Sequence, residues 1–367
     1  MSNREIVQAE ALQMTLENDR CGLGISMGVG KTRVAIDHLK KNYSPLITAL
    51  VVIPKLSVKD SWLDELKKTD SEFLLEHLTF TTYLSINKHN PDRYDIVYLD
   101  ECHSLLDSHE FFLKAYEGKI VGMTGTPPKR RGSEKFRMVD KYCPIIYEFS
   151  VDDATDQNIL NNYQIVVHEL QLSKLHTLVK TSKLGKTWYT SEYKDYEYCT
   201  TRIGDAQTQK QKQFASIMRM RALMDYKTKE GYLKGLLKNI NSKCIVYANT
   251  QKQADRICKH SYHSGNKNSE ENLELFADGR IGKLSCVLQL SEGVSIPELK
   301  QGIIMHAYGN ERKSAQRIGR LLRLNPSETA ICHILCYKET VDIKWINTAL
   351  ADFDKSKIKY FNPLNPV

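Results

Sequence analysis

Short apolar runs recur along this chain, and each gives way at once to polar residues and then to a stretch with helical character. The runs span residues 48–53, 96–99, 120–123, 244–248, 284–290, 302–306 and 331–336. Strand-sized apolar segments that alternate with helical patterns predict mainly parallel sheets with helices on both faces. We therefore expect an α/β fold.

The alternation weakens near Cys143 and resumes at Cys244, so the runs fall into two groups. A chain of 367 residues has room for two domains of ordinary size. We place the first at residues 1–149 and the second at residues 150–367. Within the second, a polar, Lys-rich segment at about 173–238 predicts a mostly helical insertion.

A glycine-rich segment, Gly22–Gly30, precedes a helical pattern that starts at Lys31. We expect a loop here, because glycines let backbone N–H groups approach phosphate closely. Lys31 can pair with the β and γ phosphates, and the Thr32 hydroxyl can hold Mg²⁺. Ile25 stands at the first glycine position of the strict phosphate-loop pattern. The segment alone therefore leaves open an ordinary helix start with a flexible lead-in.

Two adjacent acids, Asp100 and Glu101, follow the apolar run at 96–99. Neighbouring residues at a strand end project to opposite sides. One carboxylate can therefore coordinate Mg²⁺ while the other polarises an attacking water. A solvated turn is the alternative interpretation. The glycine segment, the acid pair and the arginines near residues 317–323 follow one another in an order that favours ATP hydrolysis.

Three polar residues in the segment QRIGRLLR, namely Gln316, Arg320 and Arg323, lie at spacings i, i+4 and i+7. They would share one face of a helix. Two arginines aimed at one place need an anion, and the γ-phosphate of ATP would supply it, as in an arginine finger. A basic helix face in water is the alternative, but the pattern Gln-x-x-Gly-Arg-x-x-Arg favours the finger.

These motifs, in this order, resemble those of the superfamily 2 helicases and translocases. The resemblance covers about residues 4–325 and is carried by SMGVGKT (26–32), DECH (100–103), TGTP (124–127) and QRIGRLLR (316–323). VVIPKLSVKDSW (51–62) and TFTTY (79–83) look like motifs Ia and Ib of the branch with Swi/Snf-type remodellers, phage recombination helicases and restriction-enzyme motor subunits. The resemblance implies two RecA-like lobes, each a mainly parallel sheet flanked by helices, with the ATP site in the cleft between them.

The resemblance also implies roles for the motif residues, and ATP and Mg²⁺ as cofactors. Adenine would be read by Gln8, phosphate bound by Gly28, Gly30, Lys31 and Thr32, and Mg²⁺ held through Thr32 and Asp100. Glu101 would be the general base, His103, Thr124 and Thr126 would couple hydrolysis to lobe movement, and Gln316, Arg320 and Arg323 would complete catalysis.

A nucleic-acid track is implied by further motif matches. CIVYANTQKQADRI (244–257) resembles motif IV, and QLSEGVSIP (289–297) resembles motif V, with Ser295 where the family often has an acid. The candidate contacts are Lys55, Ser57, Thr81, Thr82, Asn249, Thr250, Ser291 and Gly293. Hydroxyl, amide and Lys groups suit phosphate oxygens, which fix register without reading sequence. We therefore expect sequence-independent, salt-sensitive binding.

The formal net charge of +8 permits a polyanionic partner without demanding one. The remodeller-like motifs favour DNA over RNA. No run of 18 apolar residues occurs, the N-terminus lacks an apolar core, and the nine Cys are an odd number without paired close spacing. We therefore expect a cytoplasmic protein that does not contact a membrane. We expect a monomer, leaving open an accessory partner and a viral protein acting in a host cell.

The function predicted from the sequence is an ATP-dependent DNA helicase or translocase. Translocation on duplex DNA, or remodelling of branched DNA, without strand separation is the alternative. An RNA helicase and a nucleic-acid-binding module with an inactive nucleotide site rank lower, the latter because a binder would not need the Gln and Arg residues of QRIGRLLR.

Two further patterns have competing interpretations. Cys332 and Cys336 lie in an alternating apolar run, which favours a buried strand over a zinc site. A Lys-rich stretch of the insertion contains Trp188, Tyr189, Tyr193, Tyr196 and Tyr198. Aromatic residues between lysines can stack on bases, but we favour packing of a hairpin against its own lobe.

Overall fold

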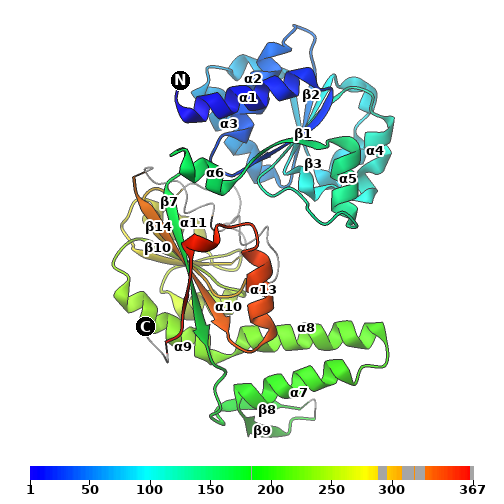
Figure 1. Cartoon of the computed structure of the whole chain (residues 1–367). Helices are drawn as coiled ribbons and strands as arrows, with labels where there is room; N and C mark the ends of the chain where they lie inside the picture. Colours follow the sequence, from blue (N-terminus) through cyan, green and yellow to red (C-terminus); the bar gives the residue numbers. More distant parts are fainter. Residues whose placement is uncertain (183, 288–295, 308–317, 319–326, 364–367) are drawn as a thin grey trace. The chain divides into compact units, whose positions relative to one another are not determined.

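A computed structural model of the chain describes residues 1–182, 184–287, 296–307, 318 and 327–363 (Figure 1). The chain divides into two compact units. The first is Met1–Asn162, and the second contains most of the described residues from Tyr163 onward. Phe149, the expected end of the first domain, is the last residue of a strand in the first unit.

The first unit is a six-stranded sheet in the order β3-β2-β4-β5-β1-β6, and its pairings are parallel. The strands are β1 (Arg20–Ile25), β2 (Ala49–Ile53), β3 (Leu78–Thr82), β4 (Ile96–Asp100), β5 (Lys119–Thr124) and β6 (Ile145–Phe149). The helices are α1 (Asn3–Glu17), α2 (Lys31–Lys41), α3 (Lys59–Lys68), α4 (Glu110–Ala115), α5 (Glu134–Tyr142) and α6 (Val151–Asp156). Short 3-10 turns, including η1 (Leu56–Val58) and η5 (Cys102–Ser104), follow some of the strands.

Both faces of this sheet are buried. In β2, Leu50 and Val52 join the core cluster that contains side chains of α4 and α5, whereas Val51 and Ile53 join the cluster with α2 and α3. Figure 1 shows α2 and α3 on one side of the sheet and α4 and α5 on the other. Burial on both faces explains why these strands are continuous apolar runs in the sequence.

The second unit contains a seven-stranded sheet in the order β11-β12-β10-β13-β14-β7-β15. Its strands are β7 (Asn162–Leu170), β10 (Cys244–Tyr247), β11 (Ser261–Tyr262), β12 (Lys283–Cys286), β13 (Gln301–Ile304), β14 (Thr329–Tyr337) and β15 (Ile358–Phe361). Its helices include α9 (Lys227–Asn239), α10 (Gln251–Ile257), α11 (Ser269–Ala277) and α13 (Val341–Ala349). Side chains of α9 and α10 pack with β10 and β13 in one core cluster.

An arm interrupts this unit after β7 (Figure 1). It consists of the antiparallel hairpin β8 (Leu178–Thr181) and β9 (Thr187–Thr190), followed by α7 (Glu192–Gly204) and α8 (Gln209–Asp225). Its base is fixed to the sheet domain, because Val341 N donates to Tyr196 Oη at 2.9 Å within a cluster that also holds Leu170 and Tyr337.

A buried ion pair adds to this anchor. Lys229 Nζ, on α9, lies 2.5 Å from Asp342 Oδ2 and also donates to the Met305 carbonyl at 2.9 Å. Both charged side chains are almost fully buried. The ion pair therefore ties α9, the helix after the arm, to α13, and the bond to Met305 ties it to the residue that follows β13.

The structure confirms the α/β class and the two mainly parallel, helix-flanked sheets. Cys332 and Cys336 lie in β14, which confirms a buried strand there. The loop predicted for Gly22–Gly30 is wrong in its first half, because Gly22 to Ile25 belong to β1. Glycine is required at position 22 by close packing, since a Cβ there would lie 2.5 Å from the Cys143 carbonyl oxygen.

The packing expected for the aromatic residues of the arm is correct for Tyr196 and wrong for others. Trp188 is 46% exposed, Tyr189 70% and Tyr198 61%. Along the described part of the chain, no helix is both long and apolar enough to cross a membrane.

Candidate active site

The phosphate-binding candidate is the turn between β1 and α2. Gly28 (φ 87°) and Gly30 (φ 111°) both adopt left-handed conformations that favour glycine. Gly30 is the N-cap of α2 and supplies no side-chain cap. The first N–H groups of a helix that lacks such a cap are available to an anion. The turn therefore has the backbone geometry of an anion site.

Gln8, on α1, holds this turn in place. Its Nε2 donates to the Val29 carbonyl at 2.7 Å. A Cβ on Gly30 would approach that same Nε2 to 2.3 Å, so the glycine allows the contact. Gln8 therefore supports the loop itself, and its contact with adenine remains a prediction.

The acid pair lies where β4 ends. Asp100 is the last residue of the strand and is 7% exposed. Its Oδ2 accepts a hydrogen bond from Trp62 Nε1 at 3.0 Å, and its carbonyl accepts one from Tyr83 Oη at 2.9 Å. Trp62 on α3 and Tyr83 after β3 thus fix the side chain and the main chain of the same residue.

Glu101 has the left-handed backbone conformation, with φ 54°. For a residue other than glycine this costs on the order of 1–3 kcal/mol, and such strain often accompanies functional sites. The turn directs Glu101 toward β5 rather than along β4. There Thr124 Oγ1 donates to Glu101 Oε2 at 3.3 Å.

The hydroxyl of Thr124 connects three of the predicted site residues. His103 Nδ1 lies 2.8 Å from Thr124 Oγ1 and 3.3 Å from Glu101 Oε2. Thr126 N donates to Thr124 Oγ1 at 3.0 Å. The ends of β4 and β5 are therefore joined by one polar network that includes Glu101.

Electrostatics set the two carboxylates apart. Burial raises the pKa of Asp100 above its usual range, and the negative charge of Glu101 raises it further. Burial alone would also raise the pKa of Glu101, but Lys31 and His103 outweigh it and hold that pKa below its usual range. Lys31 Nζ lies 4.0 Å from Glu101 Oε1.

The surroundings of Lys31 fit a phosphate group and a metal ion. Ser26 Oγ and Thr126 Oγ1 are buried, and neither has a hydrogen-bond partner among the residues that the structure describes. A Cβ on Gly125 would lie 3.2 Å from Lys31 Nζ, so glycine keeps this space open. Oxygen-rich surroundings with one Lys suit Mg²⁺ and phosphate.

The predicted nucleic-acid contacts of the first unit lie at the ends of β2 and β3. Lys55 and Ser57 are exposed just after β2. Thr82 ends β3 and is half-buried, whereas Thr81 is only 5% exposed. Their contact with nucleic acid remains a prediction.

In the second unit, Asn249 and Thr250 follow β10. The Thr250 hydroxyl caps α10 by accepting from Gln253 N, and Asn249 N donates to Gln253 Oε1. The other predicted residues of this half, Ser291, Gly293, Gln316, Arg320 and Arg323, lie outside the described residues.

The sequence did not assign roles to Trp62, Tyr83 or Ser26. Trp62 lies in the stretch that resembles motif Ia and Ser26 lies in the phosphate-loop motif, so the motif matches could have indicated both residues. No sequence pattern links Tyr83 to Asp100, because that contact depends on the order of strands in the sheet.

Two protein-family models match the chain. Residues 3–129 match the model described as the res subunit of type III restriction enzymes, and residues 228–325 match the helicase conserved C-terminal domain. A DNA 3′-5′ translocase, XPB2 of Sulfurisphaera tokodaii, is 24% identical over 369 residues, which cover 92% of this chain and 82% of that protein.

Solved structures share the fold. The type ISP restriction-modification enzyme LlaBIII bound to DNA has a TM-score of 0.64 at 14% identity, with 99% of this chain covered. This chain spans only 31% of the length of that enzyme. S. cerevisiae Dbp5 bound to RNA and ADP BeF3 has a TM-score of 0.57 at 13% identity, with coverage of 97% and 89%. At these identities the likeness concerns the fold alone.

The two mainly parallel, helix-flanked sheets match RecA-like lobes, and the first carries a candidate phosphate-binding turn beside an acid pair, as in proteins that hydrolyse nucleotides. The two family matches and the translocase relative support a superfamily 2 helicase or translocase, a class of ATPases.

Proposed function

We propose that the chain is a DNA-stimulated ATPase that uses ATP and Mg²⁺ to move along DNA without regard to sequence. The observation that carries this proposal is the cluster at the carboxyl ends of β1, β4 and β5. There Lys31 faces an acid pair beside two buried hydroxyls that have no partner among the described residues.

The residues have distinct tasks in this proposal. Lys31 and the N–H groups at the start of α2 hold the phosphates, while Thr32 and Asp100 hold Mg²⁺. Held there, Mg²⁺ would supply positive charge to the phosphates. Glu101 Oε accepts a proton from the attacking water and is kept ionised by Lys31 and His103. Gln316, Arg320 and Arg323 would act on the same phosphates.

The hydrolytic role of Glu101 is tested by Glu101→Gln, which keeps the size of the side chain and removes its basicity. We expect turnover to fall by about 10²- to 10⁴-fold, while ATP binding stays within about threefold. Glu117→Gln, at an exposed position of the same unit, is the matched control. Turnover that survives Glu101→Gln would contradict the assignment.

DNA is favoured over RNA because a translocase named for DNA aligns with nearly the whole chain. The second candidate function is translocation on duplex DNA without strand separation. It is supported by the same relative, which is named a translocase. A forked DNA with one labelled strand, and a triplex displaced from an intact duplex, separate these candidates. Displacement of the triplex strand without opening of the fork would assign duplex translocation.

We also propose that the protein works as a monomer. Sedimentation at working concentration, with and without DNA, tests this. A DNA-bound species with two copies would contradict it.

A further inference from the structure

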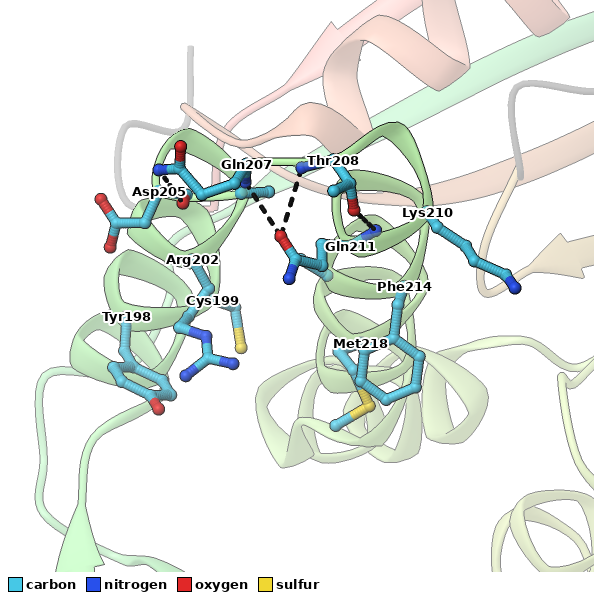
Figure 2. A pocket seen from close by; sticks show the side chains of 12 residues that line it. Tyr198, Cys199, Arg202, Asp205, Gln207, Thr208, Lys210, Gln211, Phe214 and Met218 are labelled. Atoms are coloured by element: carbon cyan, nitrogen blue, oxygen red, sulfur yellow. Dashed lines mark hydrogen bonds between the residues drawn. The ribbon is translucent and has the colours of Figure 1, made fainter.

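A recess of about 840 Å³ lies between α7 and α8, close to the turn that joins them (Figure 2). It is within the size range of small-ligand sites, which is about 300–1,000 Å³. Its walls include Tyr198, Cys199 and Arg202 from α7 and Gln211, Phe214 and Met218 from α8. Figure 2 shows that these side chains come from both helices.

Large apolar side chains are open to solvent at this recess. Phe214 is 64% exposed, Tyr198 61% and Met218 45%. Nearby Tyr196, on the same helix as Tyr198, is packed against the sheet domain. The arm is thus anchored at its base and displays aromatic groups toward its tip.

The arm is also positively charged. Between residues 173 and 226 there are ten Lys and Arg against five Asp and Glu. Two of these acids are buried near the base of the arm, where Glu192 accepts from Thr228 Oγ1 of α9 at 2.7 Å and Asp195 pairs with Lys180 at 2.7 Å. The charged residues that line the recess are Arg202, Lys210 and Asp205, all exposed, so the recess keeps an excess of positive charge.

A polar group for recognising a ligand is present at the turn. Gln211 Oε1 accepts from Gln207 N at 3.0 Å and from Thr208 N at 3.2 Å. The Gln211 carbonyl is thereby committed to the turn, and its NH₂ group is the part that can donate to a ligand. Figure 2 shows this side chain beside Phe214.

We propose that this recess binds unpaired nucleotides of the nucleic acid on which the motor acts. Tyr198 and Phe214 stack on bases, and Arg202 and Lys210 contact phosphate. Exposed aromatic groups within a basic surface are the recurrent solution for binding single strands. A duplex presents only base edges, whereas an unpaired base can present its face to an aromatic wall. The inference rests on the proposed function, because it takes the nucleic acid as the partner.

The test measures the affinity of the full chain for a labelled single strand and for a duplex of equal length, over a range of salt concentrations. Phe214→Ala should weaken single-strand binding by about 5- to 150-fold, the range for loss of one stacked base. The salt dependence of single-strand binding by Phe214→Ala should equal that of the unaltered protein. Phe214→Trp should restore affinity, which also shows that the arm tolerates substitution there.

A charge change has a different signature. Arg202→Gln should reduce the slope of log affinity against log salt by about 0.7, the value for one phosphate contact on a single strand. Phe111→Ala, at a position 79% exposed on α4, is the matched aromatic control and should bind as the unaltered protein does. Duplex affinity should change by less than about twofold in Phe214→Ala.

Three outcomes overturn the inference. Unchanged single-strand affinity in Phe214→Ala would remove nucleic acid from the recess and point to an acidic protein segment instead. An equal loss on single strand and duplex would make the arm a duplex contact. A loss of single-strand affinity in Phe214→Ala that Phe214→Trp does not reverse would assign Phe214 a packing role. ATP turnover of the unaltered protein is scored separately, and its failure to respond to any nucleic acid would instead contradict the proposed function.

Discussion

At the scale of residues, Asp100 and Glu101 are neighbours whose surroundings move their pKa values in opposite directions. Asp100 is buried beneath Trp62 and faces the charge of Glu101, so ionisation is costly for it. Glu101 is turned toward Lys31 and His103, which stabilise its ionised form. A carboxyl group whose ionisation becomes favourable when a cation binds suits a metal ligand. A carboxyl group that stays ionised without a metal suits a general base.

The raised pKa of Asp100 makes the nucleotide-free protein pH-sensitive. A carboxyl group with a higher pKa in the folded than in the unfolded state stabilises the fold at low pH. That contribution is lost as pH rises from the usual Asp range of about 3.9 through the raised value. Asp100→Asn should therefore raise the melting temperature without nucleotide at pH 8 and change it little at pH 4, with a gain on the order of 1 kcal/mol.

The control for this pH effect is Asp64→Asn, at an exposed position on α3. It should leave the difference in melting temperature between pH 4 and pH 8 unchanged. Addition of ATP and Mg²⁺ should stabilise the unaltered protein and not Asp100→Asn. A lower melting temperature for Asp100→Asn at pH 8 would contradict the direction assigned to Asp100.

At the scale of elements, the site depends on how three parallel strands end. β1 leads into the candidate phosphate-binding turn, β4 into the acid pair, and β5 into the segment from Thr124 to Thr126. β4 and β5 are adjacent, and β1 pairs with β5. Helix α1 then supports the turn through Gln8. The function therefore follows from strand order as much as from the motifs.

The turn before α2 can be tested with one substitution. Gly30 has φ 111°, a backbone conformation that is strained for alanine, and the Cβ of Gly30→Ala would lie 2.3 Å from Gln8 Nε2. The substitution therefore strains the backbone and also disturbs the contact of Gln8 with the turn. We expect a stability loss of about 1–2 kcal/mol and ATP affinity at least about tenfold lower. Gly132→Ala is the control, because a Cβ there meets no heavy atom within 4 Å. Equal behaviour of the two variants in ATP binding would exclude the turn as the phosphate site.

The sequence predicts the strands that are buried on both faces, because their apolar runs are continuous, as in β2 and β4. It does not predict β1, since Gly22 and Gly24 suggest a loop while close packing against neighbouring strands demands glycine. It places Lys31, Asp100 and Glu101 by motif. It does not foresee the left-handed turn at Glu101 or the bond from Trp62, which arise from tertiary packing.

The exposed aromatic groups of the arm show a similar limit. Composition and alternation of Trp188 to Tyr198 fit both a packed hairpin and a ligand-binding surface. The choice depends on which side chains meet the sheet domain, and Tyr196 does so by accepting a hydrogen bond from Val341 N. Periodicity along one element does not carry that information.

At the scale of the whole molecule, the proposed hydrolysis uses residues from both units. Arg320 and Arg323 lie outside the described residues, so their role rests on the motif and the family match at 228–325. Arg320→Ala should lower turnover by about 10³- to 10⁵-fold, the value of an arginine finger, with ATP affinity nearly retained. Arg280→Ala, an exposed position of the second unit, should behave as the unaltered protein.

The most direct test of the central claim is the rate of ATP hydrolysis by the purified protein with no nucleic acid, single-stranded DNA, duplex DNA, branched DNA and RNA, at low and moderate salt. We expect Mg²⁺-dependent turnover that DNA stimulates more than RNA does, with stimulation that declines as salt rises. Absent turnover under every condition, or turnover indifferent to nucleic acid, would contradict a nucleic-acid motor.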